Sequence, residues 1–366
     1  MQEITKDLKW RDCMRFYTRA FAALMLAASL LSGCGAVHSH NDLSAEAVEA
    51  VPMSAEAEWV FDAMPVPMAS APEQTVRSET KQSAADLGAV ANPEAPAALP
   101  LTLVPEAPGT NQTKNGRAVI DYSNTAEGYV MVQFTGATQK RLKVQVAGPA
   151  TTYTYDLTVG EWEVFPLSDG NGTYKVTVFE NVTDCKYTVE LSASFAVELK
   201  DAFGPYLYPN QYVDYSAAVN TVAKAAELVR GKEGTLDRVF AVYDYVVKNL
   251  SYDYAKAASV TSGYLPVLDS VLQEGKGICF DYASLMAGML RSQGIPCKLV
   301  VGYAGKAYHA WISVWTEESG WVDGVIHFDG VTWKRMDPTF ASSSKRSTEI
   351  MAFIGNDVNY TVKYLY

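Results

Sequence analysis

Histidine and cysteine are scarce in this chain, and their scarcity limits its chemistry. The 366 residues include four histidines and five cysteines. Only two histidines, His309 and His327, lie in the part whose composition is that of a folded protein. In this part no cysteines or histidines are paired at the close spacing of a zinc site, so a zinc centre built from cysteine, histidine and aspartate has no support. We therefore expect no metal and no cofactor.

Positive charge is also in short supply. The chain has 30 lysines and arginines against 41 aspartates and glutamates, a formal net charge of −11. Between residues 41 and 110 there are eleven acidic residues and two basic ones, and nine of the sixteen prolines fall there. This composition is typical of disorder, so residues 35–112 are predicted to form an acidic tether. Because no basic stripe remains elsewhere, nucleic acid is excluded as a partner.

Long apolar runs are absent except for one near the N-terminus. It extends from Phe21 to Leu31, follows two arginines and leads into the letters LSGC, which end at Cys34. The run is too short to cross a bilayer as a folded helix, and it has the form of a secretory leader over residues 1–34. Its ending resembles the bacterial lipobox, which implies that Cys34 carries a lipid; an ordinary secretory signal cleaved nearby is the alternative. We expect an extracytoplasmic protein anchored by lipid to a bacterial membrane, at the cell surface or the periplasmic face.

Residues 113–200 alternate between apolar and polar side chains. Segments such as YVMVQFTG and GTYKVTVFENV have a period of two and are separated by turn signals, among them DGNG at 169–172. Six or seven short strands at this spacing predict a small antiparallel β-sandwich. No catalytic cluster of titratable residues lies in it, so we expect a spacer or a module that binds a surface partner. Cys185, at the start of one strand, is interpreted as a small buried or edge residue.

The period becomes helical after residue 215. Helices are expected over 216–230, over 235–250 with Thr235 capping the first turn, and over 267–273. A further helix begins at Cys279 and ends at Gly294, where glycine tolerates a left-handed cap. Strands follow, from CKLVVGYA to WKRMDPTF. Helices followed by antiparallel strands indicate an α+β domain over residues 201–366.

The interpretation of function depends most on the role of Cys279. Three cysteines, Cys185, Cys279 and Cys297, remain in the folded part, and an odd number leaves at least one thiol outside a disulfide. The thiol of Cys279 can be a packed small residue, half of a disulfide, a metal ligand or a nucleophile. A nucleophilic thiol is favoured by a helix N-terminus and a neighbouring imidazole, and Cys279 has the first of these. Asp281, in the first turn, is expected to point away from the thiol or to cap the helix.

A base and an orienting carboxylate follow further along the chain. His309 begins a predicted strand, and Asp337 borders the next regular strand. With Cys279 they can supply a nucleophile, a general base and a group that orients the imidazole. His327 lies in a loop-rich stretch and is interpreted as a loop or hydrogen-bonding histidine, not as the base. Cys297, inside IPCKLVV, is interpreted as a buried strand residue.

The chain resembles the bacterial transglutaminase-like superfamily in three blocks, GKGICFDYASLMAGMLRSQGIPCKLVVGY, YHAWISVW and WKRMDPT. The resemblance runs through residues 235–341 and does not extend to the β-sandwich. It implies a papain-like fold, in which the helix that carries the cysteine packs against a sheet that carries the histidine and the aspartate. It also implies Cys279 as the nucleophile, His309 as base and acid, and Asp337 as the orienting carboxylate.

The chemistry implied is acyl transfer through a thioester. The thiolate attacks an amide carbonyl, the histidine protonates the departing amine, and water or a second amine releases the acyl group. The backbone N–H of Cys279 and a side-chain donor would hold the oxyanion, and Gln273 and Tyr252 are the candidates for that donor. Gln273 lies six residues before Cys279, the offset at which papain-type proteases place such a glutamine. It can also simply end a helix.

We therefore expect a membrane-anchored thiol enzyme that acts on protein or peptide amides. Hydrolysis is favoured over cross-linking, because water is plentiful outside the cell and nothing in the sequence identifies an amine acceptor. The alternative is a surface adhesion or scaffold protein whose β-sandwich binds a partner and whose papain-like domain is inactive. A Cys279→Ala variant separates the two, because only the enzyme would lose turnover.

Overall fold

The computed structural model of the chain describes residues 51–52, 102–317, 319–323, 325–328, 333–336, 339, 342 and 359–366. The leader, Cys34 and Asp337 lie outside these residues, and so does the predicted tether over 35–112 apart from residues 51–52 and 102–112. Within the described part of the chain, no helix is both long enough and apolar enough to span a membrane.

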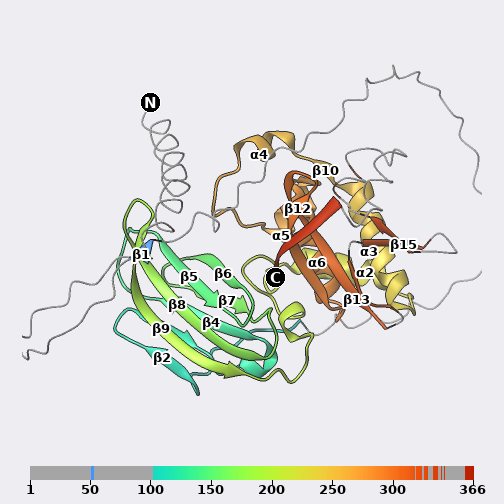
Figure 1. Ribbon diagram of the computed structural model, residues 1–366. Helices are drawn as coiled ribbons and strands as arrows, with labels where there is room; N and C mark the ends of the chain where they lie inside the picture. The colour runs from blue at the N-terminus through green and yellow to red at the C-terminus, as the bar shows by residue number, and fades with distance from the viewer. Residues whose placement is uncertain are drawn as a thin grey trace, which may run out of the picture.

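The N-terminal part is a sandwich of two antiparallel sheets (Figure 1). One sheet has the order β2-β3-β4-β7, and its strands are Gln112–Lys114, Ala118–Asp121, Tyr129–Phe134 and Trp162–Pro166. The other has the order β1-β9-β8-β5-β6, and its strands are Val51–Pro52, Lys186–Val197, Gly172–Thr183, Leu142–Ala147 and Thr152–Leu157. The predicted β-sandwich is confirmed, with eight strands between residues 112 and 197 instead of six or seven.

The alternation of buried and less buried side chains along the strands explains how the two sheets stack. In β6 the side chains of Tyr153, Tyr155 and Leu157 are buried, and the residues between them are half-buried. Because successive side chains of a strand point to opposite faces, one face of this sheet is apolar and packs on the other sheet. Cys185 is half-buried in the turn between β8 and β9.

The second part begins with helices that surround one central helix. Two 3-10 turns precede these helices: η2, Thr125–Glu127, lies between β3 and β4 of the sandwich, and η3, Gly204–Tyr206, lies between β9 and α2. The elements that follow are α2 Val219–Val229, α3 Thr235–Asn249, β10 Ser251–Tyr252, α4 Tyr254–Ser259, α5 Leu268–Glu274, β11 Lys276–Gly277 and α6 Cys279–Arg291. All thirteen residues of α6 are buried, since α2, α3 and α5 contact it together with strands β12 and β13. The expected cap at Thr235 is wrong: Thr235 is the first helical residue of α3, and Gly234 precedes it without a side-chain cap.

An antiparallel sheet lies against α6 (Figure 1). Its order is β14-β13-β12-β17, and its strands are Gly320–Asp323, Ala307–Thr316, Cys297–Ala304 and Tyr360–Leu365. A separate pair is formed by β15 and β16, Val325–Phe328 and Trp333–Met336. The α+β architecture predicted from the order of helices and strands is therefore confirmed.

The C-terminal end lies between the sandwich and the α+β part (Figure 1), and aromatic rings pack around it. The ring of Tyr366 meets Tyr153 and Tyr155 of the sandwich and Tyr212 of the connecting segment, each edge to face, with centroids 4.7 to 5.7 Å apart. The guanidinium of Arg291, at the end of α6, donates to the backbone carbonyl of Tyr366 at 2.7 Å. One continuous apolar core joins the two parts and fixes α6 relative to the sandwich.

Candidate active site

Cys279 is the first residue of α6, directly after the extended residue Ile278. Its backbone N–H therefore belongs to the first turn, where amides lack partners within the helix and can bind an anion. The side chain is only 1% exposed. A substrate carbonyl can reach the thiol only when neighbouring groups move aside.

Asp281 fixes the start of this helix from two residues further on. Its carboxylate is fully buried and accepts the backbone N–H of Ile278 at 2.8 Å, which confirms the capping role expected for it. The same carboxylate accepts from the ammonium of Lys256 at 2.7 Å and from the hydroxyl of Tyr264. Gly277 leaves room for this cap, because a Cβ there would lie 2.5 Å from the Cβ of Asp281. Lys256 and Tyr264, which sequence reasoning missed, tie the α4 segment to the helix that carries the thiol.

Tyr252 lies close to the thiol through a short parallel strand pair. Strand β10 pairs with β11, and Tyr252 is opposite Gly277, two residues before Cys279. Its hydroxyl is buried and, within the described part of the chain, has no hydrogen-bond partner. Burial is the main cause that raises the pKa of Tyr252, and the nearby charge of Cys279 adds to it, so the phenol remains a protonated donor.

Gln273, the other candidate for the oxyanion donor, has a different environment. It is exposed on α5, one residue before the end of that helix. The surroundings of Tyr252 match those of an oxyanion donor more closely, because a buried donor near the nucleophile is preorganised and shielded from water.

His309 lies on β13, opposite Gly302 of β12, and is fully buried. Its ring stacks on that of Trp311 at 6.0 Å, since side chains two apart share a face of the strand. Helix α6 packs against this strand. Burial raises the pKa of the neighbouring Tyr308, and Cys279 is among the charges that add to the effect. The structure thus brings the helix of Cys279 and the strand of His309 into contact.

The predicted orienting carboxylate, Asp337, lies outside the described residues and stays a prediction. The strand before it in sequence, β16, pairs with β15, and β15 contacts β13. His327 was expected in a loop, but its backbone lies in β15 opposite Lys334. The β15–β16 pair is therefore a neighbour of the strand that bears His309.

The other cysteine of the α+β part, Cys297, has the surroundings of a residue that serves packing. Cys297 begins β12 and is fully buried, as expected, and burial raises its pKa to about 12. Cys279 and Cys297 are not joined in a disulfide. Among the residues that the structure describes, no group of three or more histidine, cysteine, aspartate or glutamate side chains could hold a metal ion.

These features define a class of site, in which a cysteine at the start of a buried helix packs against a strand that bears a histidine. A family comparison agrees with this class: residues 222–324 match the model of the transglutaminase-like superfamily. The chain therefore contains a transglutaminase-like domain. The matched segment includes Cys279 and His309 and ends before Asp337.

Known proteins resemble parts of the chain. It is 24% identical over 181 residues to the uncharacterized protein YebA of Bacillus subtilis, covering 44% of this chain and 25% of that protein. It is 29% identical over 92 residues to a protein-glutamine gamma-glutamyltransferase of Pseudomonas aeruginosa, covering 21% of this chain and 12% of that protein. A solved structure provisionally described as a cysteine protease, from Cytophaga hutchinsonii, aligns at 15% identity and a TM-score of 0.33 over 65% of this chain and 79% of that chain. The chain thus spans a quarter or less of the two curated relatives.

Proposed function

We propose that this protein is an extracytoplasmic, lipid-anchored thiol enzyme that cleaves or transfers the acyl groups of protein or peptide amides. One observation carries the proposal: Cys279 starts a buried helix that packs on the strand of His309, inside the segment that matches the transglutaminase-like model. The anchor at Cys34 and the location outside the cytoplasm rest on the leader sequence alone.

The reaction would proceed through a thioester on Cys279. His309 removes the proton of the Cys279 thiol, and the sulfur attacks the carbonyl carbon of the amide. The C–N bond breaks as His309 donates this proton to the leaving amine. The oxyanion would accept hydrogen bonds from the backbone N–H of Cys279 and from the hydroxyl of Tyr252. His309 then removes a proton from water or from an amine, which attacks the thioester carbonyl. The C–S bond breaks, and the proton returns from His309 to the sulfur. Asp337 would orient the imidazole.

Hydrolysis is the outcome that we favour over transfer to an amine, because water at high concentration competes with any acceptor. The relative from Pseudomonas aeruginosa bears the name of a glutamyltransferase, so both outcomes belong in the first assay. A macromolecular partner at the surface of the β-sandwich remains a prediction.

The burial of Cys279 favours a second candidate, a surface binding protein without turnover. A thiol that is 1% exposed has no open path to a substrate in the described arrangement. The two candidates differ in what the loss of the thiol would do, because a binding protein does not need it.

The test compares the full chain with Cys279→Ala and with Cys185→Ala as a matched control. Cleavage of casein and incorporation of a fluorescent alkylamine into casein are measured in parallel. The enzyme predicts that Cys279→Ala lowers turnover on the order of a thousandfold or more at an unchanged melting temperature, while Cys185→Ala retains it. Equal signals from all three proteins would contradict the enzymatic proposal and favour the binding protein.

A further inference from the structure

The hairpin of β8 and β9 carries an apolar cluster on the face of its sheet that points away from the other sheet. Val178 of β8 belongs to the core between the sheets, so the next residue, Phe179, points to this outer face. Phe179 is 6% exposed and Tyr187 of β9 is 4% exposed, and the two form a cluster separate from the core. Val189, opposite Phe179, is 45% exposed. The outer face of the hairpin, defined by Phe179, Tyr187 and Val189, is therefore apolar surface that the core does not use.

The tether reaches this face at the edge of the sheet. Strand β1 pairs with β9, with Val51 opposite Tyr187 and Pro52 opposite Lys186, and Figure 1 shows β1 beside the strands of this sheet. An edge strand offers backbone N–H and C=O groups to any extended segment that can reach it. Here the extended segment comes from the same chain.

The tether also has apolar side chains close enough to cover the cluster. Six residues, 53–58, separate Pro52 from the letters WVF at 59–61. Six residues span at most about 20 Å, and neighbouring strands lie only about 4.8 Å apart. The chain can therefore turn back from the edge and cross β9 to reach β8. Packing Trp59 and Phe61 there removes from water apolar surface that a free tether leaves exposed.

The charges of the tether and the hairpin are complementary. Residues 42–76 contain no lysine or arginine, and Glu56 and Glu58 lie between the paired strand and the apolar letters. On the sandwich, Lys186 is exposed opposite Pro52, and Lys140 is exposed in the loop before β5, the strand that pairs with β8. Exposed ion pairs add little energy each, but their sign favours an acidic segment.

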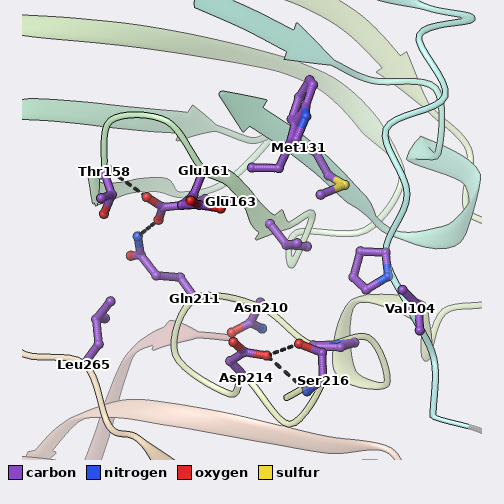
Figure 2. A pocket seen from close by; sticks show the side chains of 14 residues that line it. Val104, Met131, Thr158, Glu161, Glu163, Asn210, Gln211, Asp214, Ser216 and Leu265 are labelled. Atoms are coloured by element: carbon purple, nitrogen blue, oxygen red, sulfur yellow. Dashed lines mark hydrogen bonds between the residues drawn. The ribbon is translucent and has the colours of Figure 1, made fainter. Parts of the chain in front are cut away.

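A pocket of about 460 Å³ elsewhere on the sandwich also has apolar walls, from Met131 and Trp162, but its charge disfavours the tether. Figure 2 shows Glu161, Glu163 and Asp214 in this pocket. None of its fourteen lining residues, all of them described, is lysine, arginine or histidine. Like charges repel an acidic segment there, so the hairpin is the better surface for it.

We propose that the outer face of the hairpin is a docking surface for the chain's own tether, and that residues 51–61 are its occupant. Val51 and Pro52 extend the sheet, and Trp59 and Phe61 cover Phe179 and Tyr187.

Docking shortens the connection between the lipid anchor and the folded part. From Cys34 to Val51 the extended chain measures about 60 Å, compared with about 270 Å from Cys34 to Gln112. The sandwich, and with it the thiol, would then stay close to the membrane. This consequence rests on the anchor in the proposed function, whereas the docking stands on the hairpin alone.

Hydrogen exchange of the full chain, followed by mass spectrometry, measures the docking. We expect the amides of residues 51–61 to exchange at least tenfold more slowly than those of residues 80–95, which belong to the same tether and are the internal reference. Equal, unprotected exchange of the two segments would overturn the proposal. Protection that increases with protein concentration would also overturn it, because the occupant would then be the tether of a second copy.

Variants tie the protection to the hairpin. Val189→Asp puts a charge on the outer face, and Val159→Asp, whose valine is 42% exposed between β6 and β7, is the matched control. We expect the first to abolish the protection of residues 51–61 and the second to retain it; equal protection in both would place the tether elsewhere. Trp59→Ser combined with Phe61→Ser changes only the tether and should abolish the protection as well, and protection that persists would contradict the assigned occupant. Exchange needs neither turnover nor a lipid, so this proposal and the proposed function fail separately.

Discussion

Tyr252 offers the thiol a hydrogen-bond donor that the fold does not otherwise use. The phenol is buried beside the start of α6, and its hydroxyl makes no hydrogen bond to another described group. A buried donor without a partner costs stability, and such a cost is retained where the donor serves the reaction. In the proposed mechanism, the acceptor that satisfies it is the oxyanion.

We expect Tyr252→Phe to lower kcat on the order of a hundredfold, because one oxyanion donor is lost. The melting temperature should stay the same or rise, since the variant removes an unsatisfied buried hydroxyl and keeps the ring. Tyr254→Phe is the control: Tyr254 is 53% exposed and its ring packs edge to face on Tyr252 at 4.9 Å. Kinetics on casein and thermal denaturation of both variants provide the measurement; unchanged kcat in Tyr252→Phe would remove the hydroxyl from the mechanism.

At the residue scale, the sequence predicts the role of a residue where its contacts are with near neighbours in the chain. A cysteine at a glycine-flanked helix start and an aspartate two residues later are enough to predict a thiol at the N-terminus and a cap, and the cap at Asp281 is observed. Lys256 and Tyr264 could not be predicted, because they reach Asp281 through a loop whose path no periodicity specifies. Gln273 and Tyr252 could not be ranked, because burial depends on packing between elements.

At the scale of elements, α6 is held at its first turn by an ion pair. The Asp281 carboxylate is fully buried, and the Lys256 ammonium that neutralises it comes from α4. Another lysine–aspartate pair, Lys248 with Asp244 on α3, has the same 2.7 Å separation, but its lysine side chain is 65% exposed. Equal distance therefore does not mean equal energy. Solvent screens the exposed pair, whereas water does not reach the buried carboxylate to replace the ammonium.

We expect Lys256→Met to lower the free energy of unfolding by about 3 kcal/mol, because Asp281 is left as a buried charge without its cation. The matched variant Lys248→Met should lower it by about 0.5 kcal/mol or less. Urea denaturation followed by circular dichroism measures both. Similar losses in the two variants would show that the pair at Asp281 is no more important than one on the surface.

Helices and strands with a strong periodicity of apolar residues were predicted well, but the residues at which they begin and end were not. The helix expected over 216–230 begins instead at Val219, and Gly234, not Thr235, occupies the position before α3. Three residues before α2 continue the connector, where Ser216 bonds to Asp214 in a local turn. Short-range bonds of this kind compete with the first helical turn, and periodicity does not register them.

At the scale of the whole molecule, the sandwich and the α+β part share one core. Tyr366 lies at the seam with 1% exposure and contacts aromatic rings from both sides. The sequence predicted both architectures but no contact between them, because nothing in a local pattern specifies which surfaces meet. A shared core couples the stability of the two parts, since neither can unfold without exposing the aromatic surface of the other.

We expect the full chain to unfold in a single calorimetric transition and Tyr366→Ala to separate it into two. Removing a fully buried tyrosine should lower the free energy of unfolding by about 3 to 5 kcal/mol. The lost contacts lie between the two parts and not in the interior of either one. Tyr303→Ala, which removes a half-buried ring of β12 that packs on Tyr308 of β13, is the control and should retain one transition at a lower temperature. If Tyr366→Ala also unfolds in one step, coupling does not depend on this ring, and the contact between the rings of Tyr212 and Phe280 becomes the stronger connection between the two parts.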